Sequence, residues 1–314
     1  MNASYPFPRV LRIEPASQCN LACIHCPTGT VAMKRGIMSS DIFEKIMHEV
    51  TLHKEHIKVI VLYHGGEPLL NKEFGNMAQR LKKINPKFFI KTVSNGMALT
   101  QERAKELIEC GLDAIEFSLD GLSAQESEKV RRKSDVEKIV KNIDYLLRLK
   151  KELSSQTPTV SLATTQFFLE SYPQENYPSP TAPAWLLELF QAQDIDQFKT
   201  TYAMKWPHMG ESGMFHELTV SHPAGYIKYC DHAINTLTIR ADGLVVPCCY
   251  DLTSQMPMGN IMNESLEAIW NGSAYARLRE SLLKQTNLPK LCSHCLVFNN
   301  PIYLIPKWRT HESN

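Results

Sequence analysis

The sequence lacks the features that mark export, membrane insertion and nucleic-acid binding. Its first ten residues contain neither the basic segment nor the apolar core of a signal peptide. No apolar run approaches the roughly 18 residues that a membrane-spanning helix needs. The 34 Lys and Arg residues are balanced by 33 Asp and Glu residues, for a net charge of +1, whereas nucleic-acid-binding surfaces carry clustered Lys and Arg. We therefore predict a cytoplasmic protein with no membrane partner, and nucleic acid is not expected as a partner.

The length and composition are those of an ordinary globular protein. The 314 residues leave room for about two domains. Hydrophobic residues make up 43% of the chain and charged residues 21%, which is a usual balance for a folded protein with a sizeable core.

Nine cysteines are present, and their number and placement argue against disulfide bonds. The count is odd and no export signal is found, whereas disulfides belong mainly to exported proteins. Three cysteines lie near the N-terminus and five in the last third of the chain, which indicates two metal sites. The remaining one, Cys110, ends a helix-like segment just before Gly111, and we interpret it as a buried structural thiol.

The N-terminal group consists of Cys19, Cys23 and Cys26, in the spacing C-x3-C-x2-C. Three thiolates so close in sequence hold three irons of a four-iron, four-sulfur cluster and leave the fourth iron open to a ligand that is not protein. Zinc sites usually take four protein ligands, or three that include His. The spacing therefore favours a cluster with one open corner.

Strands and helices alternate over the first two thirds of the chain at a spacing of roughly 30 residues, as in repeated βα units. Apolar runs predict strands at residues 10–13, 57–62, 88–93, 114–119, 159–164 and 200–204. Helical spacing predicts helices that begin at residue 40 or 41, and at residues 72–83, 100–110, 135–151 and 184–192. Polar motifs follow the strand ends, where open and closed α/β barrels keep their sites.

Two segments after residue 165 do not continue this pattern. Residues 170–183 are rich in proline and predict a loop or an insertion. Residues 206–229 carry Trp206 and several His residues. The Gly and Pro residues of this segment number five, Pro207, Gly210, Gly213, Pro223 and Gly225. The segment either lines a substrate pocket or serves as a linker between domains.

The C-terminal region predicts a hairpin and a second metal site. Strands at residues 236–240 and 244–247 flank the tight-turn pair Asp242-Gly243, and the hairpin would bring Cys248 towards Cys230. The pair Cys292 and Cys295 completes a set of four thiolates. On spacing alone, zinc competes with an iron–sulfur cluster for this site.

These motifs resemble those of a known family. Residues 10 to about 205 resemble the radical S-adenosylmethionine (SAM) superfamily in the cysteine motif, in Gly65-Gly66-Glu67-Pro68 and in the two later strand-end motifs, Ser94-Asn95-Gly96 and Ser118-Leu119-Asp120-Gly121. The C-terminal region resembles the SPASM/twitch extension in Cys230, in Gly243 with Cys248, and in Cys292 with Cys295. No cysteine follows Cys295, so the short form with one auxiliary cluster fits better than the longer form.

The resemblance implies a fold and a division into domains. The implied fold class is α/β, a partial (β/α)6 barrel with a small C-terminal twitch domain made of a β-hairpin and a helix. Residues 1–205 would form the barrel, residues 206–229 the linker or substrate-lining segment, and residues 230–314 the auxiliary cluster domain.

The resemblance also implies the cofactors and their contacts. Cys19, Cys23 and Cys26 would hold the [4Fe-4S] cluster that binds SAM, and Cys230, Cys248, Cys292 and Cys295 a second [4Fe-4S] cluster. The contacts to SAM would come from His25, Gly65, Gly66, Glu67, Pro68, Ser94, Asn95, Ser118, Asp120 and Arg131. Some of them have an alternative interpretation. Ser94, Asn95, Ser118 and Asp120 could each cap the helix that follows instead, and Arg131 belongs to a basic run, residues 129–133, typical of a solvated face.

Cys249 is the residue that bears most on the reaction. Neighbouring residues in an extended segment point to opposite faces, so a cluster ligand at Cys248 directs Cys249 away from that cluster and towards the barrel mouth. A thiol there can donate a hydrogen atom to a substrate radical, as in radical SAM epimerases. A buried spare thiol and an alternative cluster ligand are the other interpretations of Cys249.

The resemblance thus predicts a radical SAM oxidoreductase or epimerase. A 5′-deoxyadenosyl radical would take a hydrogen atom from an unactivated carbon of a hydroxylated small molecule, a sugar or an aminocyclitol. Epimerisation with Cys249 as hydrogen donor, or dehydrogenation through the auxiliary cluster, would follow. An external one-electron reductant of the flavodoxin or ferredoxin type is the expected partner. The alternative is a maturase that epimerises or cross-links a ribosomally made peptide, although only nine residues precede the first strand to form a peptide-recognition module.

Overall fold

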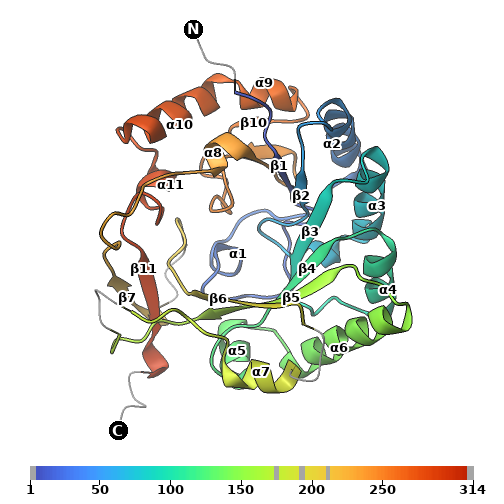
Figure 1. The fold of residues 1–314 in the computed structure, drawn as a ribbon. Coiled ribbons are helices and arrows are strands. Elements are labelled where there is room, and N and C mark those ends of the chain that lie inside the picture. Colours follow the sequence, from blue (N-terminus) through green and yellow to red (C-terminus); the bar gives the residue numbers. More distant parts are fainter. Residues whose placement is uncertain (1–4, 173–176, 191–194, 210–212, 310–314) are drawn as a thin grey trace.

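Six parallel strands form the central part of one curved sheet (Figure 1). The computed structural model describes residues 5–172, 177–190, 195–209 and 213–309. The parallel strands are β1 (Val10–Ile13), β2 (Val59–Val61), β3 (Phe89–Ser94), β4 (Ala114–Ser118), β5 (Thr159–Gln166) and β6 (Gln197–Tyr202). They pair in chain order, each with the next. The predicted α/β fold with a partial barrel is confirmed.

Helices cover the outer face of this sheet (Figure 1). They are α2 (Ser40–Leu52), α3 (Phe74–Ile84), α4 (Gln101–Glu109), α5 (Ala124–Val130), α6 (Val136–Glu152) and α7 (Ala184–Phe190). Side-chain oxygens cap four of them at the N-terminus: Ser39, Thr100, Ser123 and Asp135 each accept a hydrogen bond from a backbone N–H of the first turn. These helices bury their apolar stripe against outward-facing strand residues such as Ile60, Ile90 and Ile115. The main core therefore lies between the sheet and the helices.

The opposite side of β4 faces the barrel interior and is polar or small. In β4, Ile115 and Phe117 are buried under the helices, whereas Glu116 and Ser118 are half-buried on the inner side. This alternation follows from the two-residue period of a strand. The inner face therefore stays free to build a site.

Most predicted element positions agree with the structure to within a few residues. The sixth strand was predicted at residues 200–204 but occupies Gln197–Tyr202. Its polar start was not recognisable as a strand, because only one residue of the six, Tyr202, is buried. The short helix α5 was not predicted, and the last part of the helix predicted at residues 184–192 lies outside the described residues.

The C-terminal region extends the same sheet rather than forming a separate one. Strands β8 (Thr236–Ile239) and β9 (Leu244–Val246) form the predicted hairpin, and β10 (Gly259–Asn260) follows beside β9. Strand β8 pairs in parallel with β1, with Val10 opposite Thr236. The helices of this region are α8 (His232–Asn235), α9 (Leu266–Trp270), α10 (Ser273–Lys284) and α11 (Lys290–Ser293). The hairpin is thereby held directly against the first strand of the barrel.

A second, two-stranded sheet pairs β7 (Phe215–Thr219) with β11 (Ile302–Pro306) in antiparallel fashion. It was not predicted, because its strands lie more than 80 residues apart. Two hydrogen bonds connect it to the barrel: the backbone N–H of Leu304 donates to the carbonyl of Ala203, and the N–H of Phe168 donates to the carbonyl of Leu304. Part of the predicted linker, residues 206–229, is thus folded against the end of the chain. The division of the chain at residues 205 and 230 stays a prediction.

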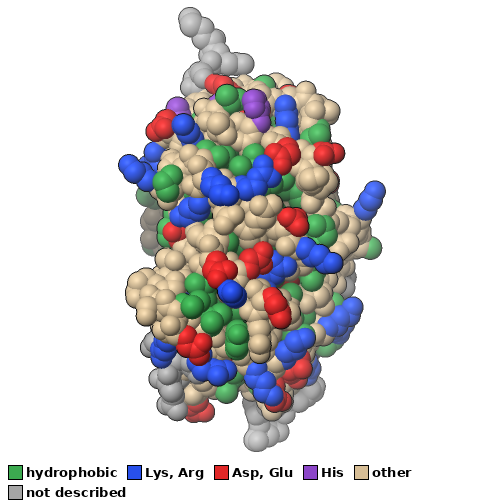
Figure 2. All heavy atoms as spheres, turned by 90° about the vertical axis from the view of Figure 1, so that its right-hand side faces the viewer, with side chains coloured by type: hydrophobic (Ala, Val, Ile, Leu, Met, Phe, Trp, Pro, Cys, Tyr) green, Lys and Arg blue, Asp and Glu red, His purple; other side chains and the backbone are tan. Residues whose placement is uncertain are grey.

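The helix-covered face carries charges of both signs without a patch of either (Figure 2). Several pair locally, such as Arg80 with Glu44 at 2.6 Å, and exposed pairs of this kind stabilise a fold by only about 0–1 kcal/mol. Among the described residues, no helix is both long and apolar enough to cross a membrane.

Candidate active site

The three N-terminal cysteines lie on a loop that follows β1 and enters the barrel interior. Cys19, Cys23 and Cys26 line one pocket of about 450 Å³, a size typical of small-ligand sites. Two backbone hydrogen bonds fix this loop. The N–H groups of Ala22 and Ile24 donate to carbonyls just after and at the end of α5, at 3.0 and 2.9 Å. Cys26 occupies the N-cap position of the short helix α1 (Pro27–Thr30), which lies in the middle of the barrel (Figure 1). Burial raises the pKa of the Cys23 thiol to about 12 against the opposing effect of Arg131.

The Gly65-Gly66-Glu67-Pro68 loop after β2 packs directly on the cysteine loop. A Cβ on Gly66 would lie 2.2 Å from the carbonyl oxygen of Ala16 and 2.4 Å from that of Gln18. The backbone N–H of Glu67 donates to the same Gln18 carbonyl at 2.8 Å. Glycine at position 66 is therefore required by close approach of two backbones.

Replacing Gly66 by alanine is expected to lower the free energy of unfolding by about 1–3 kcal/mol. The clashing atoms are backbone oxygens, which cannot move aside as a flexible side chain does. Gly36→Ala is the matched control, because a Cβ there meets nothing within 4 Å, and its effect should stay within about 0.5 kcal/mol. Urea unfolding of both variants measures the difference. Equal stability of the two variants would contradict the close packing of the loops.

Glu67 connects the second strand end to the third. Its carboxylate accepts hydrogen bonds from Ser94 Oγ at 2.9 Å, from the backbone N–H of Asn95 at 2.7 Å and from that of Leu69 at 3.1 Å. Burial raises its pKa, and these bonds oppose the rise. Pro68 begins the 3-10 turn η1 (Pro68–Leu70) that holds the carboxylate in place. Asn95 in turn donates to Asn20 Oδ1 in the cysteine loop at 2.7 Å.

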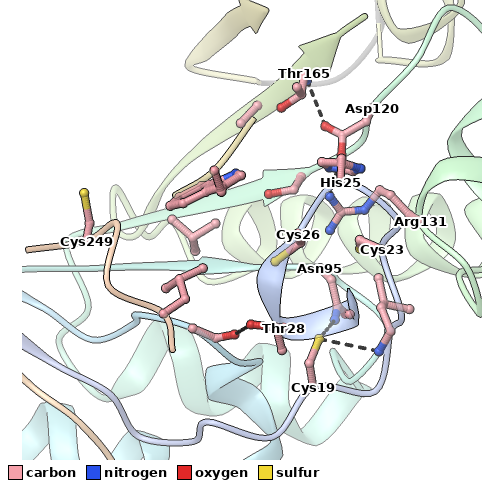
Figure 3. A pocket seen from close by; sticks show the side chains of 18 of the residues that line it. Cys19, Cys23, His25, Cys26, Thr28, Asn95, Asp120, Arg131, Thr165 and Cys249 are labelled. Carbon is pink, nitrogen blue, oxygen red and sulfur yellow. Dashed lines mark hydrogen bonds and ion pairs between the residues drawn. The ribbon is translucent and has the colours of Figure 1, made fainter. Parts of the chain in front are cut away.

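Asp120 is the centre of a buried network at the end of β4. Its Oδ2 lies 2.7 Å from Arg131 and 3.2 Å from His25 Nε2, and its Oδ1 accepts from the backbone N–H of Thr165 at 2.8 Å (Figure 3). Burial alone would raise the pKa of Asp120, but Arg131 and His25 more than offset it and hold the pKa well below its usual range. The carboxylate is therefore ionised and fixes both partners.

Arg131 does not belong to a solvated basic face. It is buried, whereas Arg132 and Lys133 next to it are less buried, so the alternative interpretation of this residue is wrong. Arg131 Nε and His25 Nδ1 are buried atoms without a hydrogen-bond partner. Both residues line the pocket beside the three cysteines.

The four C-terminal cysteines come together from three segments. Cys230 precedes α8, Cys248 follows β9, and Cys292 and Cys295 lie at the end of α11 and just after it. Burial, together with the nearby Cys230 and Cys295 thiols, raises the pKa of Cys292 to about 12. All nine cysteines are free thiols. Within the described ranges, no three His, Cys, Asp or Glu side chains form a group that could hold a single metal ion.

Cys249 lines the same pocket as Cys19, Cys23 and Cys26, from the opposite side (Figure 3). Cys248 is not among the residues that line it. The two cysteines lie in the turn after β9 and not in an extended segment, so strand alternation is not the cause of their different surroundings. The Cys249 sulfur lies 3.5 Å from His232 Nε2. Burial raises the pKa of Cys249, but His232 and Arg12 more than compensate and lower it to about 7.

Some residues in or next to this pocket were not identified from the sequence. Glu14 accepts from the backbone N–H groups of Gly65 at 2.8 Å and Ala241 at 3.0 Å, which ties the glycine loop to the C-terminal hairpin. Burial, followed by the charges of Arg12 and Arg240, lowers the pKa of His64 to about 3 and keeps it neutral. Glu14 directly follows β1, and His64 lies in the loop after β2 next to Gly65, which was the signal that could have found them.

Trp206 and Tyr250 form an aromatic wall of the pocket, with ring centroids 5.0 Å apart. Trp206 belongs to the segment for which a substrate-lining role and a linker role were both open. Its place in the pocket favours the first role for this part of the segment.

Comparison with known proteins agrees with the geometry. The model of the radical SAM superfamily matches residues 13–161, and that of an iron-sulfur cluster-binding domain, SPASM, matches residues 230–296. The GTP 3′,8-cyclase of Clostridium acetobutylicum is 32% identical over 142 residues, which cover 44% of this chain and 43% of the cyclase. The chain thus matches less than half the length of that relative. A tungsten-containing aldehyde ferredoxin oxidoreductase cofactor-modifying protein of Pyrococcus furiosus is 26% identical over 320 residues, which cover 91% of this chain and 87% of the relative.

Two solved structures share the fold over nearly the whole chain. BtrN in complex with AdoMet and 2-DOIA is 19% identical, with a TM-score of 0.57 and coverage of 93% of this chain and 94% of BtrN. The protein anSMEcpe with bound AdoMet and Kp18Cys peptide is 16% identical, with a TM-score of 0.62 and coverage of 92% and 87%. At these identities, the likeness is one of fold.

The pocket fits the SAM-binding [4Fe-4S] cluster and the SAM that the first family implies, and the four C-terminal cysteines fit the auxiliary iron–sulfur cluster that the second implies. Three thiols converge on one pocket, and the unpartnered Nε donor of Arg131 suits a negatively charged group there. The chain belongs to the radical SAM superfamily and carries a C-terminal SPASM iron–sulfur cluster-binding domain.

Proposed function

We propose that this enzyme inverts a carbon centre of a hydroxylated small molecule, with Cys249 as the hydrogen donor. The observation that carries the proposal is the placement of Cys249 across one pocket from Cys19, Cys23 and Cys26. A substrate between the two sides would meet different groups on its two faces, which inversion requires.

Each side of the pocket then has its own part. Cys19, Cys23 and Cys26 would hold the cluster that binds SAM, and Cys230, Cys248, Cys292 and Cys295 the auxiliary cluster. When bound, the first cluster and SAM supply a 5′-deoxyadenosyl radical, which takes a hydrogen atom from an unactivated carbon. The chain must place that carbon, exclude water and provide the hydrogen atom that completes the product.

The SAM contacts can be ordered by what their side chains already do. Arg131 Nε is a donor without a partner and would bind a carboxylate, His25 Nδ1 is also without a partner and would bind a ribose hydroxyl, and Asp120 orients both residues. Gly65 and Gly66 would accept the methionine part of SAM along the backbone. Glu67 already accepts three hydrogen bonds from the chain, so its part, with Pro68, Ser94 and Asn95, is to hold the loops that shape the site. Ser118 lines the pocket and would contact SAM directly.

Cys249 would complete the reaction from the other face. Its S–H bond breaks, the hydrogen atom forms a new C–H bond at the substrate carbon, and a thiyl radical is left on sulfur. One electron from an external reductant of the flavodoxin or ferredoxin type and one proton restore the thiol. His232, 3.5 Å away, would hold the sulfur in position.

Dehydrogenation is the second candidate. The likeness in fold to BtrN in complex with AdoMet and 2-DOIA favours it. The pocket is also close to the auxiliary cysteines, because the charge of Cys249 acts on Cys248 and Cys295. In that reaction the substrate loses a second electron to the auxiliary cluster, and no thiol is needed. Peptide modification is the third candidate, and the fold shared with anSMEcpe in complex with Kp18Cys peptide favours it.

The isotope content of the product separates these reactions. Reconstituted enzyme is supplied with SAM, a reductant and a panel of sugars and aminocyclitols, and 5′-deoxyadenosine formation identifies the substrate. Turnover in deuterated water is then expected to place one deuterium on the inverted carbon, because a thiol hydrogen exchanges with solvent. A product oxidised by two electrons and free of solvent deuterium would support dehydrogenation instead, and turnover of peptides alone would support a maturase. Mass spectrometry and NMR of the product measure the difference.

A further inference from the structure

The interior of the barrel, next to the pocket, carries more positive than negative charge. Arg12 of β1, Lys91 of β3, Glu116 of β4 and Lys199 of β6 all occupy inner positions of their strands. Glu116 pairs with Lys199 at 2.6 Å. Burial lowers the pKa of Lys91, Lys199 and Arg12 lower it further, and Glu116 opposes them. Three cations thus share one carboxylate.

Arg12 stands out within this group because two of its donor atoms are unused. The residue is only 8% exposed, and its Nε and Nη1 atoms are buried without a hydrogen-bond partner. In the described part of the chain, no carboxylate forms an ion pair with it. A buried donor without a partner costs folding free energy, so such a group in a native structure is expected to meet a ligand.

Arg12 does not line the pocket itself but packs against a residue that does. Its guanidinium carbon is 5.3 Å from the centre of the Tyr63 ring, and Tyr63 lines the pocket together with Cys249. The other pocket carboxylates are already bound elsewhere: Glu67 accepts hydrogen bonds from the chain, and Asp120 pairs with Arg131. A negatively charged ligand group at Arg12 would therefore meet little repulsion.

We propose that Arg12 binds an oxyanion of the substrate, a carboxylate or a phosphate, so that the substrate is an acidic or phosphorylated sugar and not an aminocyclitol. The proposal rests on the function proposed above and narrows its substrate class. A guanidinium matches the planar geometry of such groups and can bind them through two hydrogen bonds. An amine-bearing ring is disfavoured, because it would bring a further positive charge beside Arg12, Lys91 and Lys199. An oxyanion at Arg12 also brings the adjoining carbons of the ligand close to Cys249.

Calorimetric titration of the reconstituted enzyme with SAM bound tests this site without turnover. The probes are glucuronate and glucose 6-phosphate, with glucose and glucosamine as the neutral and the amine-bearing comparison. We expect the two anions to bind more tightly than glucose, and glucosamine to bind no better than glucose. The stronger of the two anions identifies the carboxylate or the phosphate as the natural group. Failure of both anions to bind more tightly than glucose would overturn the proposal.

Variants locate the binding. Arg12→Gln is expected to weaken binding of the preferred anion by about tenfold or more, because the substitution removes a charge-assisted contact. Arg9→Gln is the matched control, since Arg9 lies three residues earlier on the exposed surface and should bind the anion as the unaltered enzyme does. If Arg12→Gln does not fold, Arg12→Lys serves in its place and should keep the preference for anions with weaker affinity. Unchanged affinity in either variant would assign the binding to another group.

The outcome is independent of the proposed reaction. Formation of 5′-deoxyadenosine by the reconstituted enzyme tests the radical chemistry and needs no binding data. Anion binding without SAM cleavage would leave the site in place and refute the enzyme function. SAM cleavage without anion binding would do the reverse.

Discussion

Formation of 5′-deoxyadenosine is expected to fall to background when Cys23 is replaced by alanine. Cys23 lines the pocket together with Cys19 and Cys26. Without it, only two thiolates would remain, and the cluster would lose its site. Replacement of Cys19 or Cys26 should have the same effect. The measurement is chromatography of the nucleoside products after anaerobic reconstitution and reduction, with iron and sulfide determined on the same samples.

Cys110→Ala is the control for the loss of a thiol. Cys110 is buried outside the pocket, and its sulfur donates only to the carbonyl of Leu107 at 3.5 Å. This variant should keep SAM cleavage and about eight irons per chain, as two four-iron clusters require. SAM cleavage that persists in all three variants of the N-terminal cysteines would refute the central assignment. Tightly bound zinc and no SAM cleavage in the unaltered protein would remove the enzyme function altogether.

The second large effect is expected at Cys249. Cys249→Ala should still form 5′-deoxyadenosine, because Cys249 is on the far side of the pocket from the three cysteines (Figure 3), but it should release no inverted product. The first half of the reaction would be separated from the second. SAM cleavage within about threefold of the unaltered enzyme, together with loss of the product, marks a group needed only after hydrogen abstraction.

Cys249→Ser sharpens this experiment. A hydroxyl preserves the size of the side chain and a hydrogen-bonding group for His232, but an O–H bond is too strong to yield a hydrogen atom to a carbon radical. The serine variant should therefore fail in the same way as the alanine variant. Unchanged product from both variants would show that Cys249 is a spare thiol, and a ketone product would favour the dehydrogenase.

The motifs that were recognised from the sequence are those in which neighbouring residues act together. The cysteine triplet, Gly65-Gly66-Glu67-Pro68 and the later strand ends are short segments, and each carries a signal of its own. The barrel could be predicted from the alternation of buried strands and amphipathic helices, since each element has the periodicity of its secondary structure. The sheet formed by β7 and β11 could not, because neither strand has a partner near it in the sequence.

Individual residues show the same limit. Arg131 stands in a run of basic residues, and nothing local distinguishes it from Arg132. Of these two residues, the fold buries only Arg131, which pairs with Asp120 at the end of β4. Glu14 and His232 act through contacts with Gly65 and Cys249, and their importance follows from partners that are distant or unmarked in the sequence.

The sequence by itself determined the family, the cofactors and the order of the barrel strands, because motif spacing and hydrophobic period are local properties. Tertiary structure decided which groups share the pocket. It brought Cys249 to the side opposite Cys19, Cys23 and Cys26, and left Arg12 buried without an acidic partner. The physical reason is that β8 pairs with β1 and places the C-terminal hairpin on the barrel, a contact between segments more than 200 residues apart that no local pattern encodes.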